Sequence, residues 1–170
     1  TLGTYKVSPM SSKYTSAAED AVTIRQAFKL AGIKASVRSE QYSGGSSIYV
    51  KVKKGSVQEA TEIAKKCEKI SRCEASGEIL SGGNRYVSVS ASETLLAEIM
   101  QIIWNAGASA TQDAFSFEYA GKRYTFFRSV SSIGETHYYL HAAGALSPKH
   151  LSKYSTNLQH ALEVAAEEIA

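Results

Sequence analysis

The strongest constraint on the fold is a stretch of ten residues that occurs twice in nearly the same form. SGGSSIYVKV occupies 43–52 and SGGNRYVSVS occupies 81–90, so the copies lie 38 residues apart in a chain of 170. In each copy a glycine pair precedes residues that alternate between apolar and polar, which is typical of a tight turn followed by a half-buried strand. The duplication therefore predicts a sheet with one apolar face that needs a cover.

The residues around the two copies predict a repeating unit. A helical stripe covers 16–31, with Ser16 and Glu19 forming a capping box and Gly32 ending the helix. Alternating residues over 33–38 and 48–53 then predict a hairpin around the glycines, which supply the positive φ of a tight turn. A second helical stripe starts near Ser56, and a weak strand over 70–80 leads to the second glycine pair.

A third unit has the same spacing. Gly45, Gly83 and Gly121 recur with a period of 38, and the third is preceded by a helical stripe over 92–106 and lies in a hairpin pattern over 115–128. We therefore expect about three helix-strand-strand repeats across 16–128, followed by a C-terminal strand and helix within 129–170. The alternative is a coincidence of hairpin lengths, because the third unit shares spacing but little sequence with the others.

These patterns together predict an α+β fold. We expect a mostly antiparallel sheet with helices packed on one face, in a single domain spanning 1–170, with 107–113 as the best candidate for a linker. No apolar run approaches the ~20 residues of a membrane helix, and the first residues lack the apolar core of a secretory signal. With only two cysteines, Cys67 and Cys73, the chain is expected to be a cytoplasmic protein with reduced thiols and no membrane partner.

The uncovered face of the sheet is the candidate binding surface. Alternation places cations beside tyrosines there, and the chain has a net charge of +3, which permits an anionic partner. Such a face suits single-stranded nucleic acid, a protein partner including a second copy of the chain, or solvent alone. The candidate residues are Lys34, Arg38, Tyr49, Lys51, Lys53, Arg85, Tyr86 and Tyr124.

No arrangement of residues predicts catalysis, a cofactor or a metal site. His137 and His141 would lie about 13 Å apart along a strand, too far to share one zinc ion. Glu74 and Glu78 are interpreted as part of a solvated turn, and Cys73 has no neighbouring motif that identifies a nucleophile. We therefore expect a protein that is not an enzyme.

The segment VRSEQYSGGSSIYV, residues 37–50, resembles a signature of the large polyvalent protein-associated domain family of phage and plasmid proteins. The helix segment that begins at Ile24 resembles the one preceding that signature, so the match lies around 24–52. The resemblance implies a mobile-element accessory protein that binds a host protein complex in the host cytoplasm, plausibly for antirestriction or anti-CRISPR activity. It implies no catalytic residues, and the alternative is a nucleic-acid-binding module that uses the sheet face.

Overall fold

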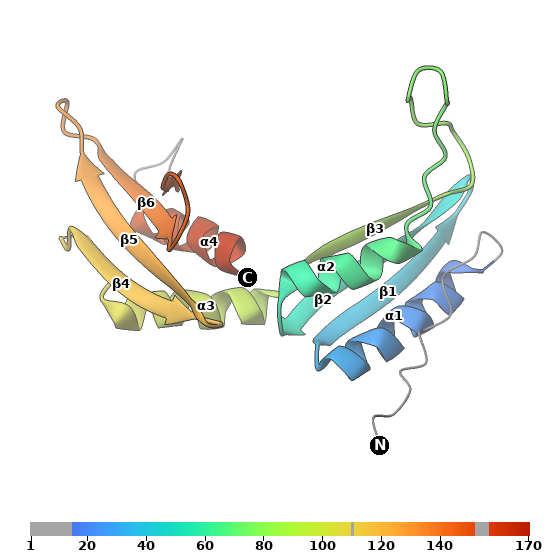
Figure 1. The fold of residues 1–170 in the computed structure, drawn as a ribbon, viewed down its shortest axis with the longest axis horizontal. Coiled ribbons are helices and arrows are strands. Elements are labelled where there is room, and N and C mark those ends of the chain that lie inside the picture. The colour runs from blue at the N-terminus through green and yellow to red at the C-terminus, as the bar shows by residue number, and fades with distance from the viewer. Residues whose placement is uncertain (1–14, 110, 152–156) are drawn as a thin grey trace. The chain divides into compact units, whose positions relative to one another are not determined.

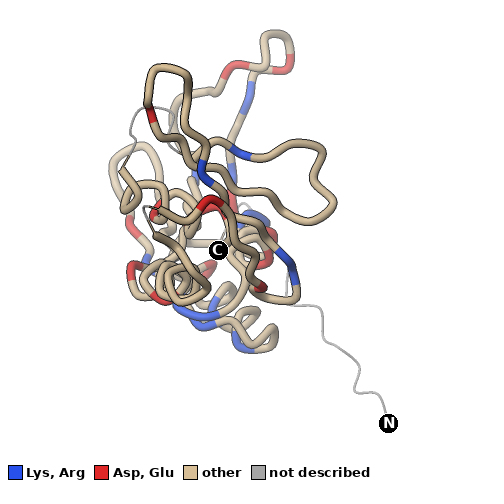
Figure 2. The backbone as a smooth tube through the Cα atoms, turned by 90° about the vertical axis from the view of Figure 1, so that its left-hand side faces the viewer, with Lys and Arg blue, Asp and Glu red and all other residues tan. Residues whose placement is uncertain are grey.

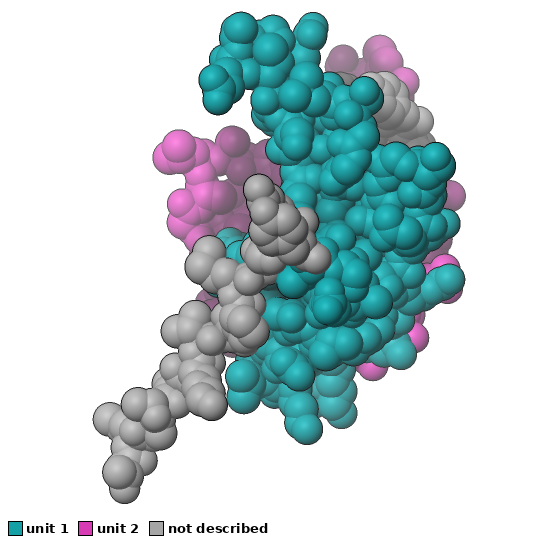
Figure 3. All heavy atoms as spheres, turned by 90° about the vertical axis from the view of Figure 1, so that its right-hand side faces the viewer, with its two compact units in different colours: residues 1–92 teal, residues 93–170 magenta. Residues whose placement is uncertain are grey.

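A computed structural model of the chain describes residues 15–109, 111–151 and 157–170. The fold divides into two compact units, Thr1–Ser92 (unit 1) and Glu93–Ala170 (unit 2), which Figure 3 colours separately. Each unit contains helices and a sheet of its own. The predicted α+β class is confirmed, with two sheets in place of one.

Unit 1 consists of a three-stranded sheet with two helices on one face. Its elements are α1 (Ala17–Ala31), β1 (Lys34–Tyr42), β2 (Gly45–Lys54), α2 (Val57–Ala64), the short 3₁₀ helix η1 (Lys65–Cys67) and β3 (Asn84–Ala91). The strand order is β1-β2-β3; β1 pairs antiparallel with β2, and β3 pairs parallel with it. Figure 1 shows α1 and α2 side by side over the same face of this sheet.

Helix α1 begins and ends where the sequence predicts. The Ser16 hydroxyl accepts a bond from the Glu19 amide at 3.1 Å, and the Glu19 carboxylate accepts one from the Ser16 amide at 2.6 Å. Gly32 ends the helix in the left-handed conformation, at φ 72°. Ile24 and Phe28 on the inner stripe are fully buried, so the helix is held to the sheet mainly by apolar packing.

The two copies of the duplicated stretch lie next to each other as the parallel strands β2 and β3. Their pairing is offset by 39 residues, so Ile48 lies beside Val87 and Tyr49 beside Ser88. An offset of 38 would pair the buried Ile48 with the exposed Tyr86, because the order of tyrosine and aliphatic residue is reversed between the copies. A shift of one residue in the register moves every side chain of the strand to the opposite face. Burial of the aliphatic residues therefore selects the pairing offset of 39 residues.

Gly45 has a different role from the one that the turn pattern predicts. Gly44 adopts the positive φ, 87°, of the turn that joins β1 to β2. Gly45 already belongs to β2, and a Cβ atom there would lie 2.7 Å from the carbonyl oxygen of Asn84. This glycine is therefore needed for the close approach of β3.

A long excursion separates α2 from β3. Residues 70–83, called the finger below, leave the sheet after Lys69 and return at Arg85, and these two residues bond through both backbone amides at 2.7 and 2.9 Å. Within the finger the Cys73 amide bonds to the Glu78 carbonyl at 2.8 Å, closing a tight loop. The predicted strand over 70–80 is therefore an extended loop rather than a sheet strand, and Figure 1 shows it projecting beyond the sheet.

Unit 2 contains an antiparallel sheet packed on two helices. Its elements are α3 (Glu93–Ala106), β4 (Ala114–Tyr119), β5 (Lys122–Val130), β6 (Thr136–Ala142), β7 (Lys149–His150) and α4 (Leu158–Ile169), with strand order β4-β5-β6-β7. Ala120 and Gly121 both have positive φ, 50° and 77°, in the two-residue turn between β4 and β5, as a primed hairpin turn requires. The helices contact each other and cover one face of the sheet.

The predicted repeat of 38 residues is not confirmed. The first and third predicted units each form a hairpin. The second unit contributes a single strand to the sheet, β3, which pairs with β2 of the first unit. The division between the compact units falls at Ser92, while the linker candidate 107–113 lies inside unit 2. The helix and hairpin of the third unit pack with β6 and α4 inside unit 2.

Candidate functional site

The face of the unit 1 sheet that is turned away from α1 and α2, here called the open face, carries four of the eight predicted binding residues. Arg38 and Tyr49 are register partners across β1 and β2, and both are exposed. Lys51 follows two residues along β2 and is also exposed. Because side chains alternate along a strand, these three project on the side opposite the buried Ile48 and Val50.

Tyr86 joins this group from the neighbouring strand. It lies beside Ser47, two residues from the position beside Tyr49, so about 8 Å separates the Cα atoms of the two tyrosines, given strand spacings near 4.8 Å and a rise near 3.3 Å. Tyr49 is 42% exposed and Tyr86 is 39% exposed. The open face therefore presents two phenol rings on adjacent strands, with cations on the far side of Tyr49.

A shallow hollow next to Tyr49 contains polar groups. It is lined by Arg38, Lys51, Glu40 and serine side chains of β1, together with Tyr49. The lining residues include one carboxylate, Glu40, and two cations, Arg38 and Lys51, so their net charge is positive. Figure 2 shows that basic and acidic residues are distributed along the rest of the described backbone.

Tyr42 belongs to the same face, although it is absent from the predicted binding residues. Its hydroxyl donates to the Ser46 carbonyl at 3.2 Å and lies 3.1 Å from the Ser47 hydroxyl. Gly45 leaves room for the Tyr42 ring, because a Cβ atom at Gly45 would lie 3.2 Å from the ring atom Cε2. The alternation of β1, continued two residues beyond Glu40, is the signal that identifies it.

Lys34 and Lys53 lie at the end of the sheet, away from the tyrosines. The register shifts between Lys34 and Ala35, because Lys34 pairs with Lys54 and Ala35 with Val52. This irregularity leaves Lys53 without a partner, as in a β-bulge, which redirects a side chain. Both lysines are exposed, and both line a hollow beside the end of α1.

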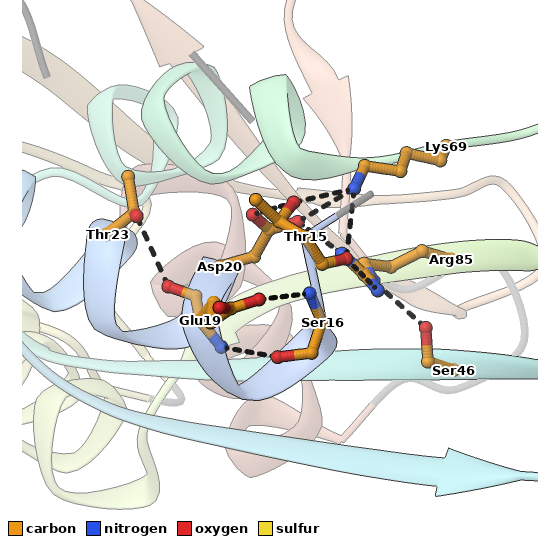
Figure 4. Close-up of polar contacts among 8 residues, drawn as sticks. All are labelled: Thr15, Ser16, Glu19, Asp20, Thr23, Ser46, Lys69 and Arg85. Atoms are coloured by element: carbon orange, nitrogen blue, oxygen red, sulfur yellow. Dashed lines mark hydrogen bonds and ion pairs between the residues drawn. The ribbon is translucent and has the colours of Figure 1, made fainter. Parts of the chain in front are cut away.

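Arg85 is not on the open face, so this prediction is wrong. Arg85 is 7% exposed and faces the helices, where its guanidinium contacts the Asp20 carboxylate, the Ser46 hydroxyl at 2.9 Å and the Thr15 carbonyl at 3.0 Å (Figure 4). The register explains the difference, because Arg85 precedes Tyr86 and must point to the opposite side. A buried arginine with this many acceptors is a structural residue.

Tyr124 is also placed differently from the prediction. It lies on β5 in unit 2, is buried, and stacks on Phe117 with ring centroids 5.5 Å apart. The prediction placed Tyr124 and Tyr49 on one sheet, whereas the fold has two separate sheets. Burial raises the pKa of Tyr124, and the nearby charge of Glu168 raises it further.

His137 and His141 both lie on β6, four residues apart, so they share a strand face as predicted. The His137 Nδ1 atom lies 3.1 Å from the His150 Nε2 atom across β6 and β7, while His141 contacts the Ala145 carbonyl at 3.0 Å. Within the described ranges, no three side chains of His, Cys, Asp or Glu gather where a metal ion could be held. In the same part of the chain, no helix is long and apolar enough to cross a bilayer.

Three of the remaining candidates, Glu74, Glu78 and Cys73, lie on the finger, and Cys67 lies just before it in η1. Glu74 and Glu78 are exposed there, in agreement with the interpretation as a solvated turn. The Cys67 side chain is buried, whereas Cys73 is partly exposed. Hydrogen bonds from the Ser76 side chain and backbone, and from the Ala75 backbone, lower the pKa of Cys73.

The chain matches no family model, no curated protein and no solved structure. The resemblance of 24–52 to the phage and plasmid domain family therefore stays a prediction that rests on the motif alone. The open face, with two tyrosines and two nearby cations on the side opposite α1 and α2, is the strongest candidate binding surface.

Proposed function

We propose that this chain is a non-enzymatic binding protein that holds single-stranded nucleic acid on the open face of unit 1. The observation that carries the proposal is the arrangement of Tyr49 and Tyr86 on adjacent strands, both about two-fifths exposed, with Arg38 and Lys51 beside them. Unstacked bases pack on exposed aromatic rings, and their phosphates contact neighbouring cations.

The magnitudes are adequate for this role. A base stacked on an aromatic side chain contributes about 1–3 kcal/mol, so two such bases supply about 2–6 kcal/mol of the roughly 8 kcal/mol that a micromolar affinity requires, and the phosphate contacts would supply the rest. Within the described part of unit 1, the helices lie on the other side of the sheet, so a strand can run across the open face without a preformed cavity. A duplex keeps its bases stacked on one another, so it cannot use the tyrosines in this way.

The test is fluorescence anisotropy of the full chain with a short labelled single strand and with the matching duplex, at two salt concentrations. We expect micromolar or tighter binding of the single strand, weaker binding of the duplex and a loss of affinity at the higher salt, because phosphate contacts release counterions. No binding of the single strand at low salt would remove the proposal.

A second function is favoured by the composition of the same face. Tyr42, Tyr49, Tyr86 and Arg38 are exposed there, and tyrosine and arginine are enriched at the centres of protein interfaces. The family resemblance supports the same direction: an accessory protein of a phage or mobile element that binds a host protein complex in the host cytoplasm and counters a defence system. The open face would then be the contact surface.

Co-purification from a host lysate tests this second function. A tagged full chain should retain a host complex, and the variant with Tyr49→Ala and Tyr86→Ala should lose it. Recovery of the chain alone, without any captured protein, would count against the second function and leave the first unaffected.

A further inference from the structure

The end of α1 and the adjoining ends of two strands enclose a second basic site, apart from the tyrosines. An open hollow of about 500 Å³ lies there, between the helix and the sheet. Three of its lining residues come from α1, Gly32 and Ile33 come from the turn after the helix, and the others come from β1 and β2. The lining residues are Arg25, Phe28, Lys29, Gly32, Ile33, Lys34, Ala35 and Lys53.

Half of these residues are cations, and the lining contains no carboxylate. Among the ion pairs formed between described residues, none involves Arg25, Lys29, Lys34 or Lys53. Like charges gathered in one hollow repel each other unless an opposite charge enters. The hollow therefore favours an anionic ligand.

Two local features hold the cations in place. The Arg25 guanidinium donates a 2.6 Å hydrogen bond to the Val37 carbonyl, which fixes it across the edge of β1. The register shift in β2 leaves Lys53 outside the strand pairing and turns it into the hollow. These features go beyond a chance gathering of surface lysines, because each depends on a specific backbone geometry.

The floor of the hollow is apolar. Phe28 is 2% exposed and Ile33 is 6% exposed, so both belong to the core beneath the cations. Charges next to an apolar floor interact more strongly than charges surrounded by water. Arginine and lysine at such a place suit a phosphate group, because its several terminal oxygens accept hydrogen bonds from more than one cation.

We propose that this hollow is a binding site for a phosphate group, either on a nucleic acid strand or on a free phosphate compound. If the phosphate belongs to a nucleic acid strand, the proposal rests on the proposed function, because the open face would hold the rest of that strand. If the phosphate belongs to a free compound, the proposal is independent of that function. The two sources share the same chemistry, and the experiment separates them.

The first arm measures pyrophosphate binding to the full chain by isothermal titration calorimetry at constant ionic strength. The variant with Lys29→Gln and Lys34→Gln removes two exposed charges and leaves Arg25 to hold the strand edge. We expect the wild type to bind and the variant to lose about tenfold in affinity or more, the scale of a lost charge-assisted hydrogen bond. The matched control, Lys66→Gln with Lys122→Gln, changes the net charge equally at exposed positions elsewhere and should bind as the wild type does.

The second arm compares labelled single strands with and without a 5′ phosphate. A gain from the 5′ phosphate that disappears in the Lys29/Lys34 variant assigns the site to a strand end; pyrophosphate binding without that gain assigns it to a free phosphate compound. Absence of both effects in the wild type, or equal losses in the variant and its matched control, would overturn the proposal.

The variant Lys51→Gln separates this proposal from the proposed function. It lies on the open face and outside the hollow, so it should weaken the unphosphorylated strand and leave pyrophosphate binding unchanged. Pyrophosphate binding that survives while no strand binds would refute the open-face function alone. Strand binding without any phosphate effect at the hollow would refute the further site alone.

Discussion

Arg85 of β3 and Asp20 of α1 form an ion pair inside unit 1, although they lie 65 residues apart in the chain. Asp20 is 1% exposed and also contacts Lys69, whose ammonium lies 3.3 Å from the carboxylate. The pair therefore ties the first helix to the last strand of the unit and to the base of the finger (Figure 4).

Removing one partner should destabilise unit 1 strongly. Arg85→Met alone leaves the Asp20 carboxylate buried with one remaining cation, and breaking a buried pair in this way costs about 3–5 kcal/mol. Asp20→Leu alone should cost a similar amount, because two cations then lose their counter-charge. Urea denaturation followed by circular dichroism measures both free energies of unfolding.

The double variant tests whether the ion pair acts as a unit. With both charges replaced by apolar side chains, no unpaired charge remains between these two residues, so the loss should be smaller than the sum of the single losses. A double variant whose loss equals that sum would mean that the two residues act independently.

The tyrosines of the open face should contribute through their rings. Tyr49→Ala and Tyr86→Ala should each weaken binding of a single strand by about 1–3 kcal/mol, whereas the two phenylalanine variants should bind nearly as the wild type does. Anisotropy titrations give the affinities. Equal losses for alanine and phenylalanine at one position would mean that the hydroxyl, not stacking, makes the contact.

Gly45 should tolerate substitution worse than Gly83. In Gly45→Ala the new Cβ atom meets the Asn84 carbonyl oxygen at 2.7 Å and the Tyr42 ring at 3.2 Å, so β2 and β3 must separate, at a cost of about 1–3 kcal/mol. At Gly83 a Cβ atom meets nothing within 4 Å, and asparagine tolerates its φ of 71° better than most residues. Thermal unfolding of Gly45→Ala and Gly83→Asn compares the two; a less stable Gly83→Asn would contradict the close-approach argument.

Unit 2 should lose stability in alkali partly through Tyr124. Burial raises the pKa of this phenol in the folded state. Above the ordinary pKa near 10, the unfolded chain ionises first, so the stability from the neutral buried phenol is complete below pH 10 and falls as the pH rises toward the higher folded pKa. Tyr124→Phe should weaken this pH dependence, measured by denaturant midpoints between pH 8 and 11.

The two cysteines should differ in reactivity. Cys73 is more exposed than Cys67. Hydrogen bonds from Ser76 and Ala75 lower the pKa of Cys73, so a larger fraction of this side chain is thiolate at neutral pH than in an ordinary cysteine. A chromogenic thiol reagent should therefore label Cys73 first, and Ser76→Ala should slow that reaction. Labelling of Cys67 ahead of Cys73 in the native protein would contradict this order.

The sequence predicts the elements of this fold better than their pairing. The helix from Ala17, the hairpin at Gly121 and the final helix are confirmed because caps, turn residues and apolar periodicity are local signals. The parallel pairing of β2 with β3 depends on contacts between distant residues, which periodicity does not encode.

The same distinction applies to the candidate site. Arg38, Tyr49, Lys51 and Tyr86 are exposed as alternation predicts, since each lies in a strand whose inner face is clearly apolar. Arg85 lies at the first residues of β3, where no alternation precedes it, and its side chain is determined by Asp20 on a distant helix. The hollow at the end of α1 was beyond sequence reasoning because it depends on an irregularity in the pairing of β1 with β2.

The finger is tied to unit 1 at its base and closed within itself. Because the Lys69–Arg85 bonds fix the base, extra residues at the exposed tip add only loop-closure entropy, about 0.6 kcal/mol for each doubling of length. Peptide tags and dyes can therefore be placed between Ala75 and Ser76 without rebuilding the sheet. The chain thus carries its own attachment point for observing the open face while that face stays unmodified.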